Sequence, residues 1–512
     1  MKNKKLFITI LFSALAMGAN YLINFFLTPY ITENIGADAY GFVSLSKTFI
    51  SYAGIITIAL NSYATRFIAV AYHRNETKKC NKYFSSVFYA NLVLSLFLLI
   101  LFSVGSFNIS HILNIPETLV NNVKLLFFLT GISFSITTCF SVFASSAYIK
   151  NQLDKTNIFK GLSYVIEAVL LIILFYLFEP SVWFVSLGAI VSSIIIGLSN
   201  FVLYKHYTPD IDIERNLVSK GAVKELVGSG IWNSLNSLGN TLNSGLDLLI
   251  TNLMLTPLAM GQLAIAKTIS SMFYALFQLL SQPFQPVFLK DYSENNMSKL
   301  IKNLKVSMIV SGLFSNLAFA GFVGVGLDYY RLWIPGQNIK LVWILTIITI
   351  FGSVIEGAVY PLYYIYTLTI KNRVPCIVTI IGGLLNVTGM YFLLTYTSMG
   401  VYAIVITTAV IMTLINSVFN PLYMSKVLNI SKKTFYGQLL RHVISCGFMT
   451  VCFYLVGHIN LSLSWFTLIL KILLCCIIGV PIHLLISLNN PMEIFKDISK
   501  LKYLLKNKLY GR

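Results

Sequence analysis

Long apolar segments, separated by short polar stretches, recur along almost the whole chain. Each has about 20 residues or more, enough for a helix to cross about 30 Å of hydrocarbon. The apolar runs are continuous rather than alternating, which favours helices over the strands of a membrane barrel. We expect an all-α integral membrane protein with about fourteen transmembrane helices. They are placed at roughly 6–30, 39–70, 83–105, 119–147, 158–178, 181–204, 222–250, 257–289, 305–327, 340–366, 374–396, 400–424, 436–458 and 464–488.

Composition and charge agree with a membrane environment. Hydrophobic residues make up 56% of the 512 positions and charged residues 11%, whereas a soluble domain has about 25% charged residues. Of the 37 Lys and Arg residues, 30 fall at the termini and in alternate loops, and 2 fall in the remaining loops. The positive-inside rule then predicts cytoplasmic termini. We read the net charge of +19 as attraction to membrane lipids, with no nucleic acid as a partner.

The chain has little room for soluble chemistry. The longest outer loops, around 106–118 and 328–339, have only about a dozen residues. The 7 cysteines are odd in number and lack zinc or disulfide spacing, and no P-loop sequence is present. We therefore expect no catalytic residues, no metal and no cofactor, and a protein that is not an enzyme.

An internal repeat relates the two halves of the chain. A shift of 220 aligns Ala39, Gly41, Lys47, Thr48 and Ser51 with Ala259, Gly261, Lys267, Thr268 and Ser271, and Ser13, Asn20 and Asn24 with Asn233, Asn240 and Ser244. A shift of 216 aligns Tyr148 and Lys155 with Tyr364 and Lys371. Six helices per half is an even number, so the halves are parallel repeats.

The repeat predicts the organisation of the chain. We expect an N-terminal six-helix lobe at 1–204, a cytoplasmic linker at 205–224, a C-terminal six-helix lobe at 225–424, and two extra helices with a basic cytoplasmic tail at 425–512. Two parallel bundles around a central cavity form the architecture of an alternating-access transporter.

Polar side chains form a stripe along the first helix of each half. Asn233, Asn240 and Ser244 belong to one face of the seventh helix, and Asn20 and Asn24 to the matching face of the first. Such residues also bond helices together in lipid. We favour a water-filled path for the matched stripes, because polar residues within a membrane tend to face cavities.

Charged residues within the spans are costly and therefore informative. Lys47 and Lys267 occupy equivalent repeat positions and are predicted to face the cavity. Arg66, near the cytoplasmic end of its helix, either extends to the interface or binds an anion. Lys124 and Lys471 are expected to extend to the outer interface.

Three acidic residues complete this set. They are Glu167, Asp247 and Glu356. They either pair with the cations or exchange protons during a transport cycle, which makes them candidates for ion coupling.

The start of the chain is similar to a known family. The polar first helix with Pro29, the turn at 36–41 and the Lys47-Thr48 segment resemble polysaccharide and O-antigen flippases of the Wzx type. So do the basic turns before the fifth and eleventh helices, the first at 152–155. These flippases belong to the multidrug/oligosaccharidyl-lipid/polysaccharide exporter superfamily, and the resemblance implies two MATE-like six-helix bundles plus two C-terminal helices.

The resemblance implies a cargo. It would be an undecaprenyl-diphosphate-linked oligosaccharide, moved across the bacterial inner membrane by alternating access for O-antigen, lipopolysaccharide or other surface polysaccharide synthesis. Lys47, Lys267 and Arg66 would contact the diphosphate, and amides and aromatic rings, such as Asn233 and Asn240, would contact the sugars. A polysaccharide polymerase and chain-length machinery would be partners.

Other classes stay open. A multidrug antiporter of the same superfamily would use a cavity carboxylate, for which Asp247 is a candidate, although paired lysines disfavour a cationic cargo. A membrane glycosyltransferase or polysaccharide polymerase would be expected to have long outer loops, which this chain lacks. A major-facilitator transporter would carry a Gly-rich Asp-Arg motif in the loop at 73–79, where none is found.

Overall fold

The structure is a computed structural model that describes residues 2–488, with side chains from Leu11 onward. Helices form most of this part of the chain, which contains no strand. Within it, 13 helices are long and apolar enough to cross a membrane. The protein is therefore a multi-pass membrane protein of the predicted all-α class. The predicted basic tail after residue 488 and the side chains of Lys2, Lys4 and Lys5 lie outside the description.

The chain divides into two compact units, of which the first comprises Met1–Ile269, Gly336–Val342 and Asn372–Ile411. Its elements, including the first parts of α12, α15 and α18, are α1 (Lys2–Asn34), α2 (Ala37–Asn61), α3 (Ala64–His73), α4 (Thr77–Phe107), α5 (Ile109–Ile112), η1 (Glu117–Leu119), α6 (Val120–Phe140), η2 (Ser141–Phe143), α7 (Ala144–Ile149), α8 (Leu153–Leu177), α9 (Trp183–Tyr207), η3 (Arg215–Leu217), α10 (Lys220–Asn240), η4 (Thr241–Gly245), α11 (Asp247–Met254), α12 (Pro257–Ser281), α15 (Ile339–Val359), α17 (Arg373–Tyr396) and α18 (Val401–Leu414).

The second unit comprises Ser270–Pro335, Trp343–Lys371 and Met412–Arg512. Besides the remaining parts of α12, α15 and α18, its elements are η5 (Gln282–Phe284), α13 (Gln285–Ser293), α14 (Met297–Trp333), η6 (Tyr360–Tyr363), α16 (Tyr364–Thr369), η7 (Ile415–Phe419), α19 (Asn420–Val427), α20 (Tyr436–Gly457) and α21 (Trp465–Ser487).

The predicted seventh span is helical but is more polar than the other predicted spans. It folds as α10, the π-helical turn η4 and α11, with a bend at Leu246. Because of the polar residues predicted to form a stripe, this span is not among the 13 helices that are long and apolar enough to cross a membrane. A π-helical turn interrupts the regular pairing of backbone groups, and such turns are frequent at functional sites.

Helix interruptions repeat along the chain and support the predicted duplication. The break after α2 lies at Ser62 and η5 begins at Gln282, which matches the shift of 220. The 3₁₀ turn η2 begins at Ser141 and η6 at Tyr360, one position short of that shift. The shift of 216 for the fifth and eleventh helices is wrong, because α8 begins at Leu153 and α17 at Arg373, so that the shift of 220 holds there too.

Five chain reversals share one backbone motif. The left-handed residues are Asn75, Asn151, Asn295, Ile370 and Asn429, with φ between 53° and 57°. At each, the next amide donates to the carbonyl five residues back, as Glu76 does to Ala71 at 3.0 Å. This is the hydrogen bond of a Schellman ending, and asparagine tolerates the left-handed conformation comparatively well. All five reversals lie at helix ends that the charge pattern predicts to be cytoplasmic.

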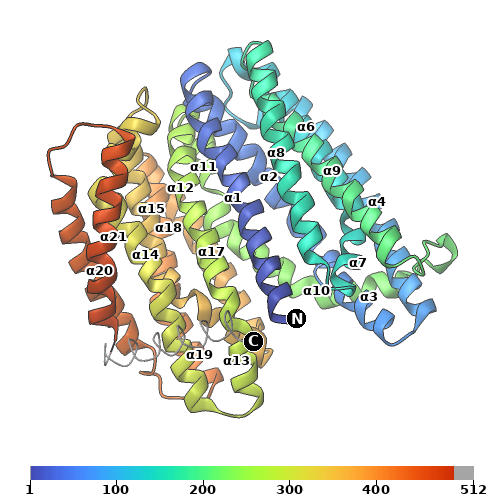
Figure 1. The fold of residues 1–512 in the computed structure, drawn as a ribbon. Coiled ribbons are helices and arrows are strands. Elements are labelled where there is room, and N and C mark those ends of the chain that lie inside the picture. Colours follow the sequence, from blue (N-terminus) through green and yellow to red (C-terminus); the bar gives the residue numbers. More distant parts are fainter. Residues whose placement is uncertain (1, 489–512) are drawn as a thin grey trace, which may run out of the picture. The chain divides into compact units, whose positions relative to one another are not determined.

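The first unit is held together by helices packed side by side. Figure 1 shows α4, α6, α8 and α9 arranged in this way. Near the predicted cytoplasmic ends of α4 and α9, the rings of Phe84 and Tyr204 stack with centroids 5.1 Å apart, and Phe143 lies 5.2 Å from Tyr204. These aromatic residues form a buried core.

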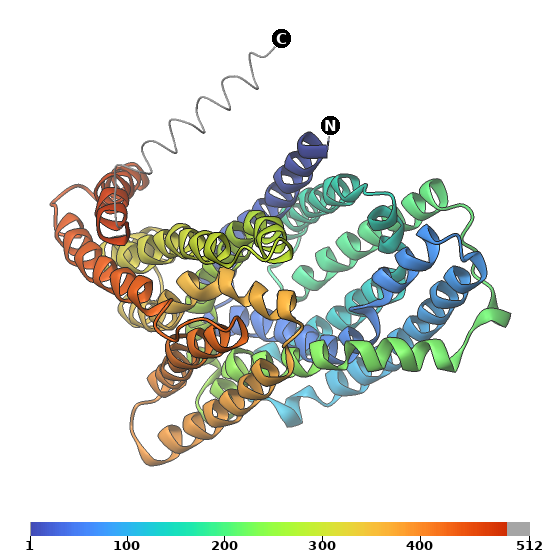
Figure 2. The ribbon, with the colours of Figure 1, turned by 90° about the horizontal axis from the view of Figure 1, so that it is seen from below.

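In the second unit, α14, α20 and α21 lie side by side (Figure 2). A buried histidine network joins them. His483 Nε2 donates to the Ile309 carbonyl at 3.0 Å, so its Nδ1 accepts from Asn316 at 3.2 Å and Ser445 at 3.0 Å. His442 donates to the carbonyl of Val354 on α15 at 3.0 Å. The two C-terminal helices are thus tied to the helices beside them by buried polar contacts as well as by apolar packing.

Candidate functional site

Lys47 is presented on α2 by a polar partner from α1. Its Nζ donates to Asn24 Oδ1 at 2.9 Å, and the Asn24 amide donates to the Asn20 carbonyl one turn earlier at 2.8 Å. This bond fixes the amide so that its oxygen faces the lysine. The Lys47 side chain is exposed, and no described carboxylate lies within 4.0 Å of its ammonium group. It is an intramembrane cation with a neutral partner.

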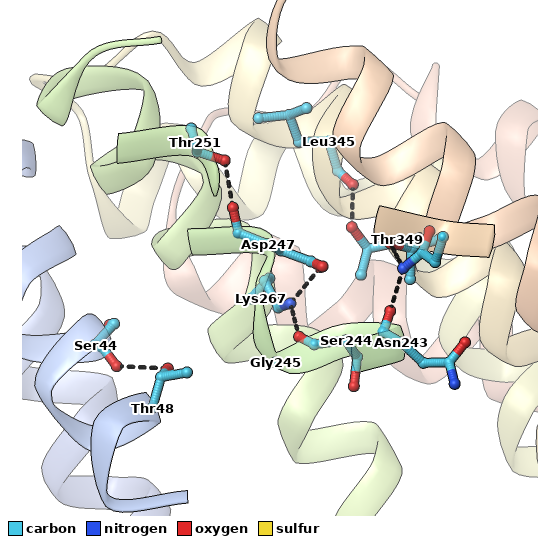
Figure 3. Close-up of polar contacts among 12 residues, drawn as sticks. Ser44, Thr48, Asn243, Ser244, Gly245, Asp247, Thr251, Lys267, Leu345 and Thr349 are labelled. Atoms are coloured by element: carbon cyan, nitrogen blue, oxygen red, sulfur yellow. Dashed lines mark hydrogen bonds and ion pairs between the residues drawn. The ribbon is translucent and has the colours of Figure 1, made fainter. Parts of the chain in front are cut away.

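Lys267, its repeat counterpart on α12, is held by an ion pair. Its Nζ lies 2.5 Å from Asp247 Oδ2 and donates to the Ser244 carbonyl at 2.6 Å (Figure 3). Asp247 is the first residue of α11, and Ser244 lies in the π-helical turn. The Asp247 side chain is 4% exposed and that of Lys267 is 24% exposed. The irregular backbone thus supplies one ligand of the ammonium group and Asp247 the other.

The two lysines therefore have related but unequal environments. Each contacts the residue 23 positions earlier, Asn24 for Lys47 and Ser244 for Lys267. These contacts agree with the predicted repeat. Asp247 has no acidic counterpart, because the shift that superimposes the two lysines aligns it with the buried Leu27. Among the described side chains, the ion pair neutralises Lys267, whereas Lys47 has no carboxylate within 4.0 Å and has Glu167 within electrostatic range.

Helix α2 contacts α10, η4 and α12 along its length, all within the first unit. Tyr52 donates to the Gly245 carbonyl at 2.7 Å, and Ser234 donates to the Ile55 carbonyl at 2.5 Å. Tyr40 and Thr268 share a hydroxyl hydrogen bond of 2.7 Å. These contacts place the polar helix α10 and the turn η4 beside α2 within one compact unit.

Helices α2 and α12 approach each other closely at two glycines. A Cβ atom on Gly261 would lie 2.0 Å from the Ala37 carbonyl oxygen, and one on Gly41 would lie 2.9 Å from the Gly261 backbone. Both positions lie at helix ends predicted to be on the outer side. Only residues without a side chain permit this packing.

Gly261→Ala should lower the melting temperature of the detergent-purified protein and reduce transport, because overpacking of this kind typically costs about 1–3 kcal/mol. Gly447→Ala on α20 is the matched control, since a Cβ atom there meets no atom within 4 Å. Equal melting temperatures for wild type and Gly261→Ala, measured by thermal unfolding, would show that the two helices do not need this approach.

Among the described side chains, Arg66, Asn233 and Asn240 are not hydrogen-bond partners of the two lysines, unlike Asn24. Arg66 lies on α3 and is exposed, in a cavity at the predicted cytoplasmic end of the unit. Asn233 and Asn240 on α10 are both exposed, and that they face a cavity stays a prediction. Asn20 and Asn24 are partly buried.

The three predicted acidic residues do not form one cluster. Asp247 pairs with Lys267. Glu167 on α8 is within electrostatic range of Lys47. Glu356 lies in the second unit, 5% exposed and within electrostatic range of Tyr274 and Tyr363. No group of three His, Cys, Asp or Glu residues in the described part of the chain could hold a metal ion.

The prediction for Lys471 is wrong. Instead of extending to the interface, its side chain is only 7% exposed and lies 2.9 Å from Asp328 Oδ2. It also donates to the Gly457 carbonyl at 3.0 Å. The two charged residues are 143 positions apart, so no periodicity within one helix reveals the pair.

Several buried amides were missed because their role is to join helices. Asn61 and Asn91 exchange two side-chain hydrogen bonds of 2.9 Å. Asn243 donates to the Thr379 carbonyl on α17 at 2.7 Å, and Asn386 donates back to the Asn243 carbonyl at 2.5 Å. Their location within apolar spans was the available signal, and for them the helix-association alternative is the correct one.

Fold and site together define a multi-pass membrane protein with a lysine and amide cluster inside its first unit. The fold is similar to that of an inward-facing multidrug resistance MATE family transporter of the MOP superfamily, with a TM-score of 0.64 and 14% identity over 82% of this chain and 99% of that one. It is also similar to the lipid II flippase MurJ in an inward closed conformation, with a TM-score of 0.62 and 15% identity over 96% of this chain and 99% of that one.

The sequence comparisons specify the family. The chain belongs to the family described as polysaccharide biosynthesis protein, whose sequence profile matches residues 8–290. It is 29% identical, over 447 residues, to the uncharacterized membrane protein EpsK of Bacillus subtilis (strain 168), covering 87% of this chain and 88% of that protein. The predicted resemblance to polysaccharide flippases is confirmed at the level of the family and fold.

Proposed function

We propose that the protein is a flippase for undecaprenyl-diphosphate-linked oligosaccharides in the bacterial inner membrane. The observation that carries this proposal is the exposed Lys47, an intramembrane cation that bonds to Asn24 and has no carboxylate within 4.0 Å among the described side chains. A diphosphate is the part of such a cargo that most needs a cationic contact. Membership of a polysaccharide biosynthesis family and the likeness to MurJ, a lipid II flippase by name, support this cargo class.

The other parts of the cargo have matching surroundings in the first unit. Asn233 and Asn240 offer accessible amides that suit sugar hydroxyl groups. A groove of about 650 Å³ between α1 and α8 is lined almost wholly by apolar side chains, which suits an isoprenoid tail that stays within the bilayer. The head group would cross by alternating access while the tail remains in lipid.

The Lys267–Asp247 pair is the proposed coupling element. Protonation of Asp247 would release the Lys267 ammonium group to bind the diphosphate. Loss of that proton from Asp247 would restore the ion pair and release the cargo. Glu167 and Glu356 are secondary candidates for proton exchange. A polysaccharide polymerase and chain-length machinery would use the cargo on the outer side, with both termini of this protein cytoplasmic.

The alternative function is that of a multidrug antiporter, because the fold is also similar to that of a MATE transporter. A cationic drug would need a carboxylate, and Asp247 already binds Lys267 at 2.5 Å. The ion pair therefore disfavours this alternative. A polymerase is disfavoured further by the short outer loops.

The proposal is tested by deletion of the gene in its host. We expect loss of the surface polysaccharide, with complete lipid-linked repeat units accumulating on the inner leaflet, and recovery when the wild-type gene is returned. The readouts are surface polymer by gel analysis and lipid-linked intermediates by mass spectrometry. Intact polymer together with increased sensitivity to cationic drugs would overturn the flippase and favour the antiporter.

A further inference from the structure

A cationic cavity lies in the first unit, at the end predicted to be cytoplasmic and apart from the Lys47 contacts. It consists of two hollows of about 370 and 410 Å³ that share Lys79, Tyr83 and Glu225 as lining residues. Four further basic side chains line one hollow or the other; they are Arg66, Arg74, Lys78 and Lys82. One acidic residue thus faces five basic ones.

Ion pairing does not cancel this charge. Lys79 is bound by Glu76 at 3.1 Å, and Glu225 accepts a hydrogen bond of 2.7 Å from the Tyr83 hydroxyl. Among the described side chains, no carboxylate lies within 4.0 Å of the other four basic groups. The cavity therefore keeps a positive potential of the kind that concentrates anions.

Local structure explains why these charges converge. The left-handed Asn75 reverses the chain between α3 and α4, so that Arg74 ends one helix and the lysines begin the next. Lys78 and Lys82 are four residues apart on α4 and share a face. The start of α10 completes the wall through Gly221 and Ala222, and the partial positive charge of a helix N-terminus adds to the field.

The floor of the cavity is formed by buried aromatic residues. Tyr83 belongs to the buried aromatic core with Phe84 and Tyr204, and Phe67 packs against the same core. Phe67 and Tyr63 also line the cavity. The basic side chains are exposed, but they are carried by α3 and the start of α4 on this buried floor, so that less backbone freedom is lost on anion binding than for lysines on a loop.

We propose that this cavity binds the phosphate-bearing head group of a membrane lipid. The identity of this lipid rests on the proposed function. If the cargo is a lipid-linked diphosphate, the cavity would make the first contact with its head group before the head group reaches Lys47. Arg66 lies on α3, which follows α2 and Lys47 after the break at Ser62, so that both residues belong to one predicted span. An anionic phospholipid such as phosphatidylglycerol offers the same chemistry and is the second source to be tested.

The test is binding by the full-length protein in nanodiscs of neutral phosphatidylcholine, measured by native mass spectrometry. The probes are undecaprenyl diphosphate and phosphatidylglycerol, each titrated separately. We expect the Arg66→Gln, Arg74→Gln double variant to bind undecaprenyl diphosphate at least tenfold more weakly than wild type. The Arg66→Lys, Arg74→Lys variant should recover part of the binding, which excludes misfolding as the cause.

The matched control is Lys432→Gln, Lys433→Gln, which removes the same charge from an exposed loop of the second unit. An equal loss of binding in this control would show that the effect is general surface attraction and would overturn the proposal. Unchanged binding by the cavity variant would overturn it as well. A further outcome is that the double arginine variant weakens phosphatidylglycerol binding more than undecaprenyl diphosphate binding. That result would support a phosphate site and overturn its role in loading the cargo.

The deletion experiment separates this inference from the proposed function. Lost polymer in the deletion strain, together with undiminished diphosphate binding by the cavity variant, would overturn the cavity and leave the flippase standing. Intact polymer together with weakened binding would overturn the flippase and leave the cavity as a phosphate site.

Discussion

Lys47→Gln should reduce surface polysaccharide at least tenfold in a deletion strain that expresses the variant at the wild-type level. The glutamine keeps a donor for Asn24 and much of the side-chain length but removes the positive charge. A hydrogen bond to a charged group is typically worth about ten- to a hundredfold in affinity. Lys47→Arg, which keeps the charge, should retain part of the export. The measurement is surface polymer against the amount of membrane-inserted protein.

Lys124→Gln is the control for this experiment. Lys124 lies on α6 and is half-buried, and it is predicted to be near the outer interface, away from the cargo path. Its loss should leave export unchanged. Wild-type polymer in cells with Lys47→Gln would remove Lys47 from the transport path, and with it the observation on which the proposed function rests.

Much of the fold was readable from the sequence because each span carries its own signal. An apolar run of sufficient length becomes a helix in lipid whatever its neighbours are. The repeat was readable for a similar reason, since Lys47 and Lys267 retain the same spacing to their partners, Asn24 and Ser244. The sequence therefore predicted which positions are equivalent.

The partners of the charged residues were less predictable. Periodicity indicates which residues share a face of one helix, but not which neighbouring helix that face meets. Asp247 was predicted to pair with a cation or to exchange protons, but its partner was not identified until the structure showed its carboxylate bound to Lys267 on the next helix. Lys471 and Asp328 lie 143 residues apart, and only the packing of α21 against α14 brings them together. The π-helical turn that frees the Ser244 carbonyl left no sequence signal that we could read.

The inequality of the two repeats has a mechanistic consequence. The predicted parallel duplication gives two equivalent cationic positions, yet among the described side chains only the second has a carboxylate within 4.0 Å of its lysine. If both lysines were permanently free, a bound diphosphate would be held by two charges and released slowly. With one lysine neutralised by Asp247, the proposed mechanism would change the affinity for the cargo between states through a single proton.

The Lys267–Asp247 pair makes the last prediction. Asp247→Asn leaves the partly buried Lys267 without a counter-charge and should destabilise the protein by about 3–5 kcal/mol. Removing one partner of a buried ion pair costs more stability than replacing both partners, because the remaining charge is left uncompensated. The same reasoning applies to Lys267→Met. The double variant Asp247→Asn, Lys267→Met should recover most of the lost stability, because no uncompensated charge remains. Thermal unfolding of the four proteins measures this cycle.

Export by the stable double variant decides what the pair is for. If the pair couples proton movement to cargo release, the double variant should fold and still export at least tenfold less polymer. Asp328→Asn with Lys471→Met is the matched control, because it removes the ion pair of 2.9 Å in the second unit, and it should export normally. Normal export by both double variants would show that the pair at Asp247 stabilises the fold and nothing more, whereas loss in the first alone makes Asp247 the switch that frees Lys267 for the diphosphate.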